Sequence, residues 1–101
     1  MIEYINDQNK FDEFIKEGTV LVDFFATWCG PCKMLSPVIE QVEREQPDLK
    51  VVKVDVDEAP MIAAKYGIQA IPTLYLLKDG KIVDNRMGYI NKNQLESFLS
   101  K

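Results

Sequence analysis

Histidine is missing from this 101-residue sequence, and cysteine occurs only twice, as Cys29 and Cys32. A structural zinc site takes four ligands, and this pair supplies only two. Carboxylates alone could complete such a site within one chain, so the sequence argues against a metal centre. A disulfide between the two cysteines would close a very short loop, which removes little entropy from the unfolded chain. A purely structural role for the pair is therefore disfavoured.

Long apolar runs are also missing. The most apolar stretch, residues 19–28, is interrupted by Asp23, whereas a membrane-spanning helix needs about twenty apolar residues. The first residues contain no apolar run of signal-peptide length. A net charge of -4 leaves no basic surface for nucleic acid. We therefore expect a cytoplasmic monomer that binds neither membranes nor nucleic acid.

The length of the chain fits one domain, residues 1–101. Hydrophobic residues make up 47% of the sequence, enough to form a core without metals or disulfides. In a reducing cytosol, a cysteine pair that is not needed for stability is usually catalytic or redox-sensing.

Hydrophobic periodicity and turn residues divide the chain into alternating strands and helices. The Asp79-Gly80 dipeptide is a strong hairpin signal between the last two strands. This order predicts an α/β fold, a three-layer sandwich with a central mixed five-stranded sheet flanked by four helices. We expect strands at residues 2–5, 20–26, 50–56, 73–78 and 81–87, and helices at residues 7–17, 29–45, 60–66 and 92–100.

The helices should bury one face each against the sheet. The expected buried positions are Phe11, Phe14 and Ile15 in the first helix, Met34, Leu35, Val38, Ile39 and Val42 in the second, and Leu95, Phe98 and Leu99 in the last.

The cysteine pair lies where a central strand gives way to a helix. Unpaired N–H groups and the helix dipole at such a position favour a negative charge and lower the pKa of a thiol. Cys32, three residues after Cys29, lies one turn into the helix and should be the more buried of the two. Pro31 needs no N–H there, and Gly30 keeps the approach open. Attack by Cys29 on a disulfide and resolution by Cys32 fit this geometry.

A resemblance to the thioredoxin family runs through nearly the whole chain. It rests on the segments "VLVDFFAT", "WCGPCK", "KVDVDEAP", "YGIQAIPTLYLLKDGK" and "GYINKNQLESFL". CxxC alone is a weak motif, but WCGPC with a distant IPT in this strand order is highly specific.

The resemblance implies a thioredoxin fold and a protein-disulfide reductase that carries electrons to reductive enzymes and maintains cell redox homeostasis. It implies no bound cofactor other than a reversible Cys29–Cys32 disulfide. The implied partners are disulfide-containing client proteins and a flavin-dependent reductase that uses NADPH.

Two charged residues on the predicted strands have two interpretations each. Asp23 is either a strand-end acid that faces solvent or a buried acid with a raised pKa. The thioredoxin resemblance favours a buried proton acceptor for Cys32. Lys53 is either an exposed strand lysine or, by the same resemblance, the lysine that lies near this aspartate and moderates its pKa.

The resemblance also implies a substrate groove beside the cysteines. Trp28 would form one wall rather than part of the core, and Gly30 and Pro31 would also belong to the groove. The Ile71-Pro72 bond is expected to be cis, with backbone that pairs with an extended client segment. Gly88 is expected at the far rim, where a side chain would block approach.

Two positions depart from the family pattern. Phe25 stands where thioredoxins usually carry tryptophan, so an N–H donor is lost. Thr27 replaces an acid and should slightly favour the Cys29 thiolate. Both positions bear on partner preference rather than on the exchange chemistry.

Three functions fit this sequence. The leading hypothesis is a general protein-disulfide reductase, because Gly-Pro between the cysteines is typical of reducing family members. Family members that oxidise often carry a histidine there, which stabilises the thiolate and makes the protein more oxidising, and this sequence has no histidine. The alternative is a thioredoxin-fold subunit that docks a partner protein without turnover. A donor dedicated to one reductive enzyme would differ from the first only in its client.

Overall fold

The computed structural model describes residues 2–101, and its elements follow the predicted order. The strands and helices along this part of the chain are β1 (Ile2–Tyr4), α1 (Gln8–Phe14), β2 (Thr19–Phe25), α2 (Gly30–Glu45), β3 (Leu49–Asp55), α3 (Pro60–Lys65), β4 (Thr73–Lys78), β5 (Lys81–Met87) and α4 (Lys92–Leu99).

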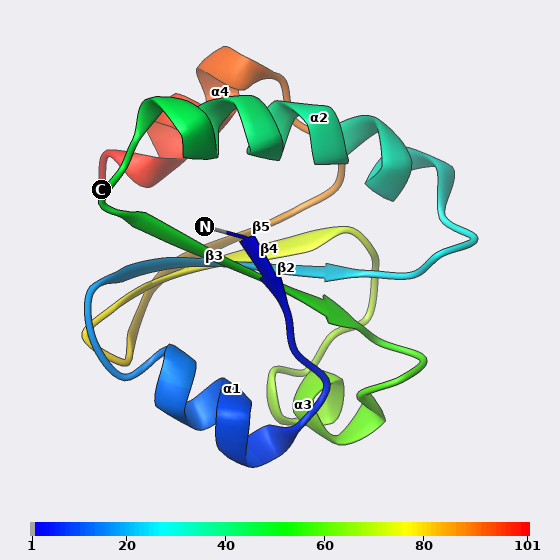
Figure 1. The fold of residues 1–101 in the computed structure, drawn as a ribbon. Helices are drawn as coiled ribbons and strands as arrows, with labels where there is room; N and C mark the ends of the chain where they lie inside the picture. Colours follow the sequence, from blue (N-terminus) through cyan, green and yellow to red (C-terminus); the bar gives the residue numbers. More distant parts are fainter. Residues whose placement is uncertain (1) are drawn as a thin grey trace.

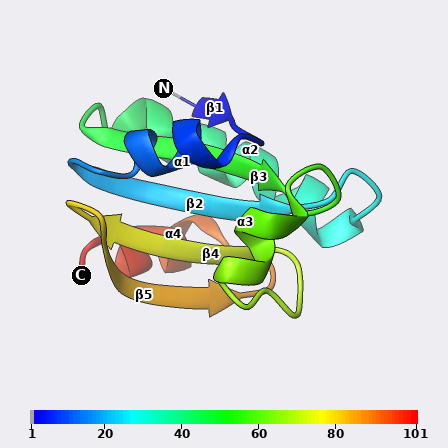
Figure 2. The same ribbon diagram turned by 90° about the horizontal axis from the view of Figure 1, so that it is seen from below.

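The five strands form one mixed sheet in the order β1-β3-β2-β4-β5. β3 runs parallel to β1 and β2, whereas β4 is antiparallel to β2 and β5. Helices α2 and α4 cover one face of the sheet, and α1 and α3 cover the other (Figures 1 and 2). The predicted three-layer sandwich is therefore confirmed.

Strand β2 lies at the centre of the sheet, and its middle residues are buried on both faces. Val20, Val22 and Phe24 pack with α1 and α3, where Phe11 and Ile62 are buried. A run of β-branched and aromatic residues suits a strand that is covered on both faces. The strand therefore enters the core and ends next to the start of α2.

The predicted hairpin and last helix are confirmed. Asp79 and Gly80 have φ angles of 50° and 82°, the positive values that a tight two-residue hairpin turn requires. Helix α4 begins with a capping box in which Asn91 and Gln94 bind each other's backbone N–H groups. Leu95, Phe98 and Leu99 are buried as predicted.

Two predictions about the helices are wrong in detail. Helix α1 ends at Phe14 rather than near residue 17, and the chain turns through Gly18, whose φ is +84°. Met34 is 62% exposed, although it was expected in the buried stripe of α2. The buried face of α2 is formed by Cys32, Leu35, Ile39 and Val42, and Met34 lies about 100° around the helix from Leu35.

None of the helices found in residues 2–101 combines the length and apolar character that crossing a membrane requires.

Candidate active site

Both cysteines lie at the start of α2, where they form a disulfide. Cys29 is the N-cap residue, and its Sγ accepts a hydrogen bond of 3.2 Å from the backbone N–H of Cys32. Pro31 occupies the first turn, and apart from the adjacent residues and the backbone of α2, no atom lies within 4 Å of the position where Gly30 would carry a Cβ. A backbone donor and a helix N-terminus both stabilise negative charge on the Cys29 sulfur after reduction.

The two cysteines are almost equally buried in this oxidised form. Cys29 is 4% exposed and Cys32 is 3% exposed, and both pack with Ala26, Phe25 and Ile71. The predicted difference in burial between the outer and the inner cysteine is therefore not seen here. In the oxidised form both cysteines belong to the same small apolar cluster.

Asp23 lies in the middle of β2, buried at 1% exposure. Neither of its carboxyl oxygens has a hydrogen-bond partner. Burial raises the pKa of Asp23 to about 6, because desolvation outweighs the lowering effect of the Lys53 charge. The interpretation of Asp23 as a solvent-facing acid is wrong.

Lys53 lies directly across from Asp23 in the β2–β3 register, and it is 4% exposed. Its Nζ is 3.9 Å from Asp23 Oδ2 and 5.6 Å from the ring centroids of both Tyr4 and Phe25. The interpretation of Lys53 as an exposed strand lysine is therefore wrong. Phe25, at the position where the family usually has tryptophan, contributes an aromatic face to this cation and no N–H donor.

The segment before β4 approaches the cysteines from the other side. The Ile71-Pro72 bond is cis, as the family resemblance implied. The carbonyl oxygen of Ile71 lies 3.9 Å from Cys29 Sγ. Gly88, with a φ of +89°, donates its N–H to the Pro72 carbonyl at 2.8 Å. Gly88 thus lies beside the cis-proline.

Trp28 is 68% exposed and therefore lies outside the core. A groove of about 200 Å³ lies between Trp28 and Ile71, with walls from Val56, Ala63 and Ile68. The indole Nε1–H of Trp28 donates to Asp57 Oδ2 at 2.8 Å. This bond fixes the orientation of an exposed ring beside the disulfide.

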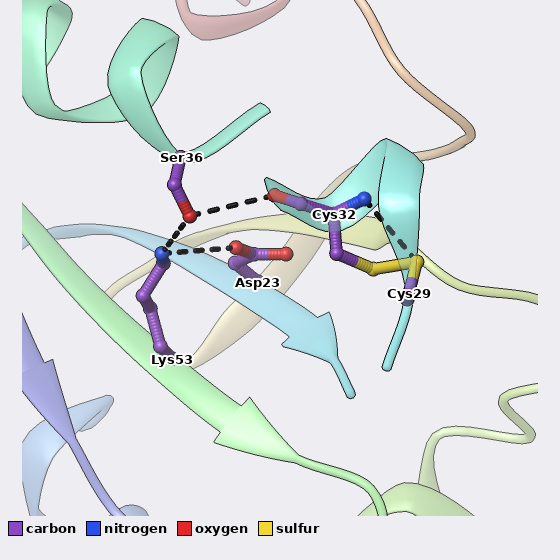
Figure 3. Close-up of polar contacts among 5 residues, drawn as sticks. All are labelled: Asp23, Cys29, Cys32, Ser36 and Lys53. Atoms are coloured by element: carbon purple, nitrogen blue, oxygen red, sulfur yellow. Dashed lines mark hydrogen bonds and ion pairs between the residues drawn. A yellow bond between two sulfur atoms is a disulfide. The ribbon is translucent and has the colours of Figure 1, made fainter. Parts of the chain in front are cut away.

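Sequence reasoning missed two residues of this site, Asp57 and Ser36. Asp57 is 29 residues from Trp28, and no local pattern connects them. Ser36 accepts a 2.6 Å hydrogen bond from Lys53 Nζ and lies 3.4 Å from the carbonyl oxygen of Cys32 (Figure 3). The spacing of four residues from Cys32 was the available signal, because residues four apart share a helix face.

Across residues 2–101, no three side chains of the metal-binding types lie close enough together to hold an ion.

An exchangeable disulfide at a helix start, with a buried acid behind it and a cis-proline segment in front, defines the class of thiol-disulfide oxidoreductases. Comparison with known proteins is more specific. The family model described as thioredoxin matches residues 2–101.

Relatives and solved structures agree with that match. Thioredoxin from Chlamydia trachomatis is 46% identical over 100% of this chain and 98% of its own length. Thioredoxin from Bacillus subtilis is 49% identical over 90% and 88% of the two chains. The oxidised form of mitochondrial thioredoxin 3 from Saccharomyces cerevisiae superposes with a TM-score of 0.91 at 38% identity, covering 98% of this chain and 93% of that one.

The chain therefore belongs to the thioredoxin family, and it is a protein-disulfide reductase. The family and fold that the sequence resemblance implied are confirmed. Family membership also gives the kinds of partner, disulfide-containing client proteins and a thioredoxin reductase.

Proposed function

We propose that Cys29 is the attacking cysteine and Cys32 the resolving cysteine of this reductase. The Cys29 thiolate attacks one sulfur of a client disulfide, and that bond breaks as a mixed disulfide forms. The released client sulfur leaves as a thiolate and takes a proton from water. The observation that carries this order is the N-cap position of Cys29, whose sulfur accepts the Cys32 N–H.

The second step completes the two-electron reduction of the client disulfide. Cys32 gives its proton to the Asp23 carboxylate, and the resulting thiolate attacks Cys29 Sγ. The Cys29–Cys32 disulfide forms, and the second client sulfur is released as a thiolate. A pKa of about 6 supports Asp23 in this role, because the group is ionised near neutral pH yet basic enough to accept a proton. Lys53 moderates that basicity through its charge.

We propose that the client disulfide binds in the groove between Trp28 and Pro72. Backbone on either side of the Ile71-Pro72 bond pairs with an extended client segment, as in strand addition. Gly30 and Pro31 form the floor beside Cys29, and Gly88 keeps the far rim low. The proximity of the Ile71 carbonyl to Cys29 Sγ, 3.9 Å, supports this arrangement.

For the wider context, we propose that residues 1–101 act as one domain and as a cytoplasmic monomer that binds neither nucleic acid nor membranes. The reductase that regenerates the dithiol is a flavin-dependent enzyme that uses NADPH. The electrons then pass to reductive enzymes and to the maintenance of cell redox homeostasis.

Insulin reduction with dithiothreitol, and then with NADPH and a flavin-dependent reductase, tests this proposal. Cys29→Ser should reduce the rate to that of dithiothreitol alone, whereas Cys32→Ser should accumulate a mixed disulfide with insulin. The stable mixed disulfide of Cys32→Ser identifies the attacking sulfur by mass spectrometry. A mixed disulfide on Cys32 in the Cys29→Ser protein, and none on Cys29 in the other variant, would reverse the assignment.

A client pull-down separates reduction from docking. Clients should be captured by Cys32→Ser and lost from a variant in which both cysteines are serine. Equal capture by both variants would favour the docking subunit instead.

A further inference from the structure

The ammonium group of Lys53 donates a hydrogen bond to Ser36 rather than to the nearby Asp23. Lys53 Nζ lies 2.6 Å from Ser36 Oγ and 3.9 Å from Asp23 Oδ2 (Figure 3). The first distance is a short hydrogen bond, and the second is too long for one. The buried ammonium group therefore forms an ion pair with the buried carboxyl group but donates no hydrogen bond to it.

The arrangement leaves the acid in an unusual state. Both Asp23 oxygens lack a hydrogen-bond partner at 1% exposure, whereas nearly all buried polar atoms in proteins have one. The Lys53 side chain is also buried and could reach a carboxylate directly across the strand pair. The ammonium group instead donates its hydrogen bond to Ser36 Oγ.

We propose that Ser36 is a positioning residue of this reductase, whose hydroxyl ties Lys53 to the first turns of α2 and keeps its ammonium group off the Asp23 carboxyl. The hydroxyl accepts from Lys53 and donates to the Cys32 carbonyl oxygen at 3.4 Å. One side chain thus connects β3 to the helical turn that carries the resolving cysteine. The carboxyl group of Asp23 keeps its lone pairs for a proton from Cys32, so the functional consequence rests on the role proposed for Asp23.

The other groups around Asp23 do not replace this contact. From β3 the charged neighbour is Lys53, and from β4 the facing residue is the apolar Leu74. On the side of α2 lies the Cys29–Cys32 disulfide, which has no proton to titrate in the oxidised protein (Figure 3). Tyr4 of β1 lies beyond Lys53, with its ring 5.6 Å from Nζ. Asp55 and Glu58 line a small pocket together with Lys53.

Removing the Ser36 hydroxyl should shorten the distance between the Lys53 ammonium group and the Asp23 carboxyl group. In Ser36→Ala the ammonium group loses its hydrogen-bond acceptor, and the nearest remaining one is Asp23. A closer opposite charge favours the ionised carboxylate and lowers the pKa of Asp23. Alanine is also the better helix former, so α2 itself should not be disturbed.

The test is an NMR titration of the Asp23 carboxyl carbon in the oxidised protein, which needs no client and no turnover. We expect Ser36→Ala to lower the pKa of Asp23 by about one unit. Ser36→Thr, which keeps the hydroxyl, should restore the parent value. Ser97→Ala, an exposed serine to alanine change in α4, is the matched control and should leave it unchanged. An unchanged or higher pKa in Ser36→Ala would overturn the proposal.

A second measurement separates this proposal from the role given to Asp23. Resolution of a mixed disulfide, followed in single turnover against pH, should shift its acidic limb to lower pH in Ser36→Ala and return in Ser36→Thr. If Asp23→Asn resolves the mixed disulfide as fast as the parent, Asp23 is not the proton acceptor, and the titration alone still decides the position of Lys53.

Discussion

The two faces of strand β2 have opposite compositions. On the face covered by α1 and α3, Val20, Val22 and Phe24 are all buried and apolar. On the face covered by α2 and α4, the strand carries Leu21 in the core and then Asp23, whose oxygens accept no hydrogen bond. The first face stabilises the fold. On the second face, burial of the Asp23 carboxyl next to the cysteines lowers the stability.

The size of that loss follows from the pKa of Asp23. A rise from 3.8 to about 6 corresponds to about 3 kcal/mol of unfolding free energy once the group is ionised. The folded state binds the proton more tightly than the unfolded state does. Stability therefore falls as pH rises from about 4 to about 6, and the loss is complete above that window. Stability near neutral pH is lower than an apolar residue would give.

The largest change in stability should come from a substitution on the apolar face of β2. Phe24 is fully buried against Tyr66 and Tyr75, with ring centroids 5.2 and 6.0 Å away. Phe24→Ala should lower the free energy of unfolding by about 3–5 kcal/mol, because it leaves a cavity in a packed cluster. Denaturant unfolding measures the loss, and the pH profile of insulin reduction by the folded fraction should stay unchanged. A shifted profile would show that the two faces are not independent.

Asp23→Ala should have the opposite effect on stability. Relative to the parent, the variant should gain about 3 kcal/mol between about pH 4 and about pH 8, because the ionised carboxylate is no longer buried. Resolution of the mixed disulfide should slow about 100-fold near neutral pH, as expected when a general base is removed. Denaturant unfolding at both pH values and single-turnover kinetics measure the two changes. A difference in stability that is independent of pH would contradict the account.

The smallest effect should come from the exposed bond between Trp28 and Asp57. Asp57→Ala removes an acceptor at the surface, so stability should change by less than about 1 kcal/mol. The indole ring loses its fixed orientation, and the KM for insulin should rise by about fivefold, equivalent to about 1 kcal/mol of client binding. Asp48→Ala, which removes an exposed acid far from the groove, is the matched control. Equal KM values in the two variants would remove this bond from client binding.

Local signals were sufficient to predict most of the fold. The apolar run of β2, the Asp79-Gly80 turn and the Asn91 cap each act within a few residues, and the structure has all three. The end of α1 was not predictable in this way, because Ile15, which follows the last helical residue, still packs against the apolar cluster on this face of the sheet. Burial without helical geometry gives the same sequence pattern as a longer helix.

The site was predictable where the family resemblance names a residue and not where contacts join distant segments. The cis form of the Ile71-Pro72 bond came from the resemblance. Ser36 and Asp57 make their hydrogen bonds to Lys53 and Trp28, which lie on other elements or loops. Such pairs depend on how α2 and the loop after β3 pack, and neither residue carries a local signal of its partner.

The most direct test of the account is the rate of alkylation of the reduced protein by iodoacetamide as a function of pH, with each cysteine resolved by mass spectrometry. The helix start and the Cys32 N–H should hold Cys29 as the more acidic thiol, so it should be labelled first, with a pKa below the value of about 8.5 that an unperturbed cysteine has. A Cys29 that titrates like an unperturbed cysteine, or that is labelled after Cys32, would contradict the assignment of attack to Cys29.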